Sequence, residues 1–170
     1  MFVFGTADDV FAMAVRIEEN GKNFYTGAAE MAQDPTAKAL FDDLAAMEAC
    51  HIDAFKSLRA SLPDSDISNV VWDPEGLAES YLQATADTHI FTVETAKSRL
   101  EKVKTPSEVL DMAIQFEKDS VAFFLGMKEL LPDPAGKGEV DKLIKAEMEH
   151  VKMLSNAAKN FSESGITGIA

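Results

Sequence analysis

The sequence holds two copies of a glutamate followed three positions later by a histidine, 99 residues apart, and each copy has a further glutamate 30 positions upstream. The six residues of this set are Glu18, Glu48, His51, Glu117, Glu147 and His150. On a helix, a spacing of three places both side chains on one face, about one turn apart. Carboxylates and imidazoles together bind divalent transition metals. The pattern therefore predicts a site for two metal ions, built from four carboxylates and two imidazoles on four helices.

The repeat extends well beyond these six residues. Moving residues 18–55 forward by 99 positions aligns them with residues 117–154. Among the identical pairs are Phe24 with Phe123, Gly27 with Gly126, and Asp34-Pro35 with Asp133-Pro134. Self-similarity over such a length indicates a duplicated structural unit. Because each Asp-Pro pair lies between two long segments with helical periodicity, the unit is predicted to be a helical hairpin.

The predicted architecture is an all-α four-helix bundle in a single domain over residues 1–165, followed by a tail at 166–170. The first hairpin covers residues 6–62, with one helix ending near residue 33 and a second beginning at Asp34-Pro35, an N-cap followed by proline in the first turn. The second hairpin covers residues 106–163, and its first helix begins with the capping box of Thr105 and Glu108 and ends near residue 131.

A long helical crossover is expected between the two hairpins, over residues 63–105. Short helices are predicted at about 77–86 and 88–103. His89 and Glu94 lie in this segment, but their spacing of five spreads them around a helix, so we expect a surface or packing role for both.

The spacing of 30 has a geometric meaning in each hairpin. Glu18 lies about 16 residues before the turn and Glu48 about 13 after it, so at 1.5 Å per residue both are roughly 20 to 24 Å from the turn. Each glutamate also falls within an apolar stripe, where an uncompensated carboxylate costs several kcal/mol. Lysines are absent from these stripes. Bound metal ions are therefore the expected source of positive charge.

Tyr25 follows Glu18 by seven residues, two turns along the same helix face. Its phenol could donate a hydrogen bond near the site or take part in radical transfer, and packing in the core is the alternative. The residue at the same place in the second copy is Phe124.

Composition excludes several classes of partner and of site. A net charge of −13 argues against a nucleic-acid partner, and no apolar run approaches the ~18 residues that a membrane helix needs. The single cysteine, Cys50, excludes an intrachain disulfide and a four-cysteine metal site within this sequence. Because the start of the sequence does not look like a secretion signal, we expect a cytoplasmic protein.

Residues 8–62 and 106–162, with the six candidate ligands, resemble the ferritin-like superfamily and, within it, the rubrerythrin-like proteins. The resemblance implies a ferritin-like bundle with a carboxylate-bridged centre of two iron ions, for which other divalent metals may substitute. It also implies a role for each ligand: Glu48 and Glu147 bridge the irons, Glu18 and Glu117 are terminal ligands, and His51 and His150 bind one iron each.

Two departures from rubrerythrins matter for function. The sequence lacks the two Cys-x-x-Cys pairs of a rubredoxin domain, so electrons are expected from a separate, rubredoxin-like donor. Ser120 stands where those proteins carry an extra glutamate, and the remaining six ligands are equally similar to the bacterioferritin ferroxidase centre.

The expected function is therefore reduction of hydrogen peroxide or dioxygen by a di-iron oxidoreductase, in a homodimer or small homo-oligomer. The alternative is a ferroxidase or iron-storage protein. The lack of a predicted fifth amphipathic helix after the fourth argues against a storage cage. A metal-binding or regulatory protein without turnover is a third possibility with the same ligands.

Overall fold

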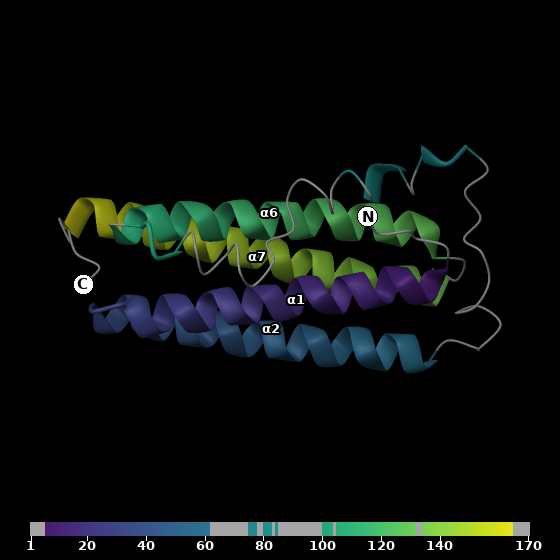
Figure 1. Ribbon diagram of the computed structural model, residues 1–170, viewed down its shortest axis with the longest axis horizontal. Helices are drawn as coiled ribbons and strands as arrows, with labels where there is room; N and C mark the ends of the chain where they lie inside the picture. The colour runs from purple at the N-terminus through teal and green to yellow at the C-terminus, as the bar shows by residue number, and fades with distance from the viewer. Residues whose placement is uncertain are drawn as a thin grey trace.

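The computed structural model describes residues 6–61, 75–77, 80–82, 84, 100–103, 105–131 and 134–164. The long helices in this part of the chain are α1 (Ala7–Met31), α2 (Pro35–Ser61), α6 (Pro106–Leu130) and α7 (Pro134–Ser164). They form a bundle of two antiparallel hairpins, α1 with α2 and α6 with α7 (Figure 1). The predicted all-α four-helix fold is confirmed, and each helix ends within about two residues of the predicted position.

Local sequence signals fix where the helices begin. Thr6 caps α1, and its side chain forms a reciprocal capping box with Asp9. Thr105 and Glu108 form the predicted box at the start of α6. At α2, the Asp34 carboxylate accepts hydrogen bonds from the backbone N–H groups of Thr36 and Ala37, at 2.9 and 2.8 Å. These side chains satisfy N–H groups that have no partner within the first turn of a helix.

The two hairpins lie in opposite directions. The connection between α1 and α2 is at one end of the bundle, and that between α6 and α7 is at the other end (Figure 1). Contacts are extensive within each hairpin and much sparser between hairpins. Because each ligand pair lies near the middle of its hairpin, this arrangement brings both pairs to the same level of the bundle.

The helices α1 and α6 are buried on two sides, whereas the sequence pattern predicted one inward face for each. Phe24 and Phe123, which are equivalent in the two copies, are both buried. Described parts of the crossover cover a second side of these helices, with Leu100 beside Gly27 of α1 and Leu82 beside Gly126 of α6. The Tyr81 hydroxyl donates to the carbonyl oxygen of Ala122 at 3.0 Å, and Leu82 and Leu100 are buried in the same core.

Two predictions for the crossover have different outcomes. Residues 77, 80–82 and 84 are helical, as expected for the first short helix. His89 and Glu94 lie outside the described residues, as does most of the second predicted helix. No described helix is both long enough and apolar enough to cross a membrane.

Candidate metal centre

All six predicted ligands lie in the interior of the bundle at one level. The four carboxylates are at most 1% exposed, and His51 and His150 are 8% and 3% exposed. Each helix contributes what the spacing predicts: Glu18 from α1, Glu117 from α6, and a glutamate with a histidine from each of α2 and α7. The six side chains therefore converge although they belong to two different hairpins.

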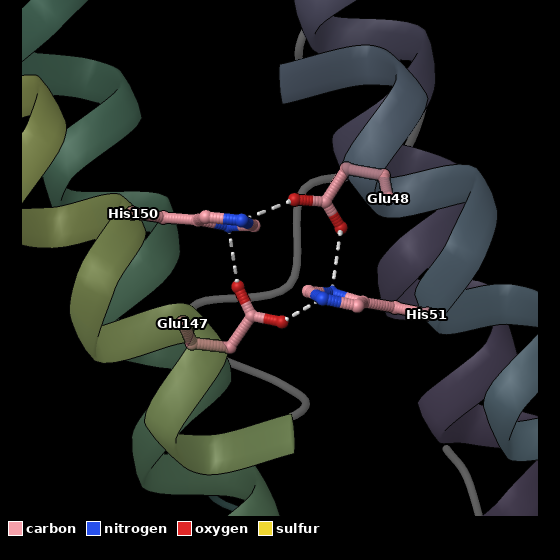
Figure 2. Close-up of side chains that lie close together, drawn as sticks. All are labelled: Glu48, His51, Glu147 and His150. Atoms are coloured by element: carbon pink, nitrogen blue, oxygen red, sulfur yellow. Dashed lines mark ion pairs between the residues drawn. The ribbon is translucent and has the colours of Figure 1, made fainter. Parts of the chain in front are cut away.

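Four of these side chains form a closed ring between α2 and α7. Carboxylates and imidazoles alternate around it, and each histidine faces both glutamates (Figure 2). The Nδ1 atom of His51 is 2.7 Å from Glu147 Oε1 and 3.9 Å from Glu48 Oε2. The Nδ1 atom of His150 is 2.9 Å from Glu147 Oε2 and 3.4 Å from Glu48 Oε1. The imidazole rings of His51 and His150 are stacked, with centroids 5.2 Å apart and planes 17° from parallel.

The two remaining glutamates each lie beside a different histidine of this ring. Glu18 Oε2 is 3.3 Å from His51 Nδ1, and Glu117 Oε1 is 3.5 Å from His150 Nδ1. Tyr25, which is fully buried, donates its hydroxyl to Glu117 Oε1. The structure thus places Tyr25 against the site, and its equivalent Phe124 has no hydroxyl with which to do the same for Glu18.

The donor atoms of this cluster fit metal ions better than they fit one another. Among the described residues, several of its buried side-chain atoms have no hydrogen-bond partner: one oxygen each of Glu18, Glu48 and Glu117, both oxygens of Glu147, and Nδ1 of both histidines. The short contacts around Glu147 lack hydrogen-bond geometry. A buried polar atom without a partner costs ~1–3 kcal/mol. One donor atom from each ring residue lies within 4.8 Å of all the others, which matches a cluster around bound metal.

In the metal-free protein, the acidic side chains of the cluster have pKa values shifted in different directions. Burial, together with the neighbouring carboxylates, raises the pKa values of Glu18 and Glu117 well above the usual range. For Glu147, burial acts in the same direction, but the contacts with His150 and His51 prevail and lower its pKa to about 2. Burial lowers the pKa of His150, and its contacts with the carboxylates outweigh burial and raise this pKa to about 12. The free site therefore retains protons that a metal must displace.

The surroundings of the cluster are apolar, as the sequence predicted. Four lysines near the ligands in sequence, Lys22, Lys118, Lys145 and Lys152, are all exposed. Ser120 is buried one turn after Glu117, but its hydroxyl donates to the carbonyl oxygen of Phe116 at 3.2 Å. Ser120 therefore takes no part in the ring.

Sequence reasoning missed Gly21, one turn after Glu18. A Cβ atom at this position would be 3.3 Å from Cδ of Glu48. The available signal was a glycine in the middle of a long helix, where it is unfavourable by ~0.5–1 kcal/mol relative to alanine.

Comparison with known proteins agrees with this geometry. The family model for rubrerythrin matches residues 9–158. A solved structure from Thermotoga maritima, provisionally described as a ferritin-like diiron-carboxylate protein, is 25% identical and has a TM-score of 0.70, and the match covers 91% of this chain and 95% of that one. No curated protein matches the sequence.

Proposed function

Because the chain belongs to the rubrerythrin family, we propose that its Glu/His cluster holds two iron ions and reduces hydrogen peroxide or dioxygen. The observation that carries this proposal is the ring of Glu48, His51, Glu147 and His150, whose donor atoms lie within 4.8 Å of one another in the interior. Several of the buried oxygen and nitrogen atoms of these residues have no hydrogen-bond partner, and the carboxylates among them would be stabilised by positively charged metal ions.

The distances suggest how the side chains divide the work. Glu48 and Glu147 each face both histidines, which would suit ligands shared by two ions. Of the two histidines, Glu18 is near His51 and Glu117 is near His150, which would suit terminal ligands. Each ion would therefore have one histidine, one terminal glutamate and a share in two bridging glutamates.

The chain's own groups prepare the site for redox chemistry. Two ferrous ions can together supply the two electrons that are needed to reduce peroxide to water. The apolar residues around the cluster keep bulk water away, which strengthens electrostatic interactions inside it. Tyr25 holds its proton at Glu117 Oε1, and burial, reinforced by the nearby carboxylates, raises the pKa of this phenol above its ordinary value. Electrons for further turnover would come from a separate protein donor.

A ferroxidase or iron-storage role is the second candidate, and the position of Ser120 favours it. Because the Ser120 hydroxyl is bonded to a backbone carbonyl, this position supplies no seventh ligand. The resulting set of six ligands is the one that resembles the bacterioferritin ferroxidase centre.

Stopped-flow absorbance would distinguish the candidates. Protein loaded without oxygen with two Fe(II) per chain is mixed in parallel with peroxide and with dioxygen. Faster oxidation by peroxide would support a peroxidase. Faster oxidation by dioxygen, with more iron taken up on each addition, would support ferroxidase activity and storage. If neither oxidant reacts rapidly, the redox proposal is wrong.

Two variants identify the reacting site in this experiment. Glu48→Gln removes the charge of a bridging carboxylate, and we expect it to abolish rapid oxidation. Glu149→Gln changes an exposed glutamate on α7 that pairs with Lys152 at 2.9 Å, and it should behave as wild type. Equal loss in both variants would indicate a general effect of charge and not a reaction at the cluster.

A further inference from the structure

Gly21 lies on α1, one turn after Glu18 and beside both Phe116 and the Glu48 carboxylate. A Cβ atom built there would be 2.7 Å from Cε1 and 3.1 Å from Cζ of Phe116, and 3.3 Å from Cδ of Glu48. Contacts below about 3 Å are essentially absent from real structures, so either the Phe116 ring or the helix would have to move. The missing side chain therefore makes room for the Phe116 ring beside the Glu48 carboxylate.

Phe116 has little freedom to give way. It is 2% exposed, and its ring stacks on Phe24 with centroids 6.4 Å apart and planes 17° from parallel. Phe116 also directly precedes the candidate ligand Glu117 in α6. A shift of this ring or of the helices would therefore disturb the surroundings of Glu48 and the position of Glu117.

The other copy of the repeat uses a different pair of residues. The equivalents of Gly21 and Phe116 at an offset of 99 are Ser120 and Ile17, and both are buried. Glycine is thus paired with a large aromatic side chain at Gly21 and Phe116. At the equivalent positions, Ser120 is paired with the smaller aliphatic side chain of Ile17. The glycine is accordingly not a general requirement of the hairpin but a match to Phe116.

We propose that Gly21 is a positioning residue, whose missing side chain lets Phe116 fix the Glu48 carboxylate where it can face both histidines. This inference rests on the proposed metal site. It assigns to Gly21 an effect on metal affinity that is separate from its effect on the stability of the helix.

The test compares Gly21→Ala with a matched glycine elsewhere. Gly138 is exposed near the start of α7, and a Cβ atom there would meet nothing within 4 Å. Metal-free protein is titrated with Co(II) without oxygen, and stoichiometry, dissociation constant and visible spectrum are recorded. We expect Gly21→Ala to weaken binding about tenfold and alter the spectrum, as changes to groups that orient ligands do. Gly138→Ala should bind as wild type.

A second pair of variants separates positioning from simple loss of structure. Phe116→Ile copies the smaller partner of the other half of the repeat, so adding Gly21→Ala in that background should change the affinity less than about twofold. Circular dichroism of the metal-free variants reports their helix content. If Gly21→Ala alone does not fold, the comparison of Phe116→Ile with the double variant still gives the answer.

Three results would overturn the inference. The first is that Gly21→Ala binds two Co(II) with wild-type affinity and spectrum. The second is that the double variant binds at least tenfold more weakly than Phe116→Ile, and the third is that it fails to fold where Phe116→Ile folds. If wild-type protein itself binds no Co(II), the proposed metal site is wrong, and the inference falls with it.

Discussion

Loading the cluster with metal should raise the thermal stability of this protein by a large and measurable amount. Ligands that bind only the folded state stabilise it by about 2.7 kcal/mol each at a free concentration 100 times the dissociation constant. Two independent ions would therefore contribute about 5 kcal/mol. A domain of this size shifts its melting temperature by roughly 2–4 °C per kcal/mol, so we expect a rise of about 10–20 °C. The source of the effect is the group of buried donor atoms that lack hydrogen-bond partners.

The assay is thermal unfolding of metal-free and Fe(II)- or Co(II)-loaded protein without oxygen, followed by circular dichroism and calorimetry. A chelator added to the loaded protein should return the melting temperature to the metal-free value. The reasoning would be refuted if either metal, at a free concentration 100 times its dissociation constant, left the transition within about 2 °C of its metal-free position, because that shift corresponds to less than about 1 kcal/mol.

Three further outcomes follow from the same contacts. Burial raises the pKa values of Glu18 and Glu117, so protons stabilise the metal-free fold below the usual carboxyl range, and this contribution is lost as the pH rises through the raised values. Because metal competes with these protons, the difference in melting temperature between loaded and metal-free protein should grow as the pH rises above the usual carboxyl range, and a constant difference would contradict this. Tyr25→Phe removes the donor to Glu117 Oε1 and should weaken Co(II) binding at one of the two positions about tenfold or more with the fold intact, as measured by calorimetric titration. Glu147→Gln should weaken binding by at least about 100-fold in the same titration, whereas Glu149→Gln, on the exposed face of α7, should leave it unchanged.

The helices and the level of the site could be predicted because both depend on local sequence. Capping residues such as Asp34 and Thr105 specify where helices begin, and their hydrogen bonds are present as predicted. The equal distances of Glu18 and Glu48 from their turn follow from the constant rise of an α-helix. The duplication then extends the same relation to the second hairpin without further assumptions.

What the sequence could not supply are the contacts between helices of different hairpins. Tyr25 is on α1, but its hydrogen-bond partner Glu117 is on α6, 92 residues away. The periodicity of α1 places the phenol on the inner face of the helix but does not identify its hydrogen-bond partner. In the same way, the second buried side of α1 depends on residues such as Leu100 that arrive from the crossover.

The duplication has a consequence for how the two halves of the centre can differ. Two identical hairpins related by a twofold axis would be bound by symmetry to place the same side chains around each half. Joining the hairpins in one polypeptide removes this restriction, so each half can change alone. Tyr25 against Phe124, and Gly21 against Ser120, are such differences. A single chain can thus specialise the two ends of one centre, which a symmetric pair of identical hairpins could not do.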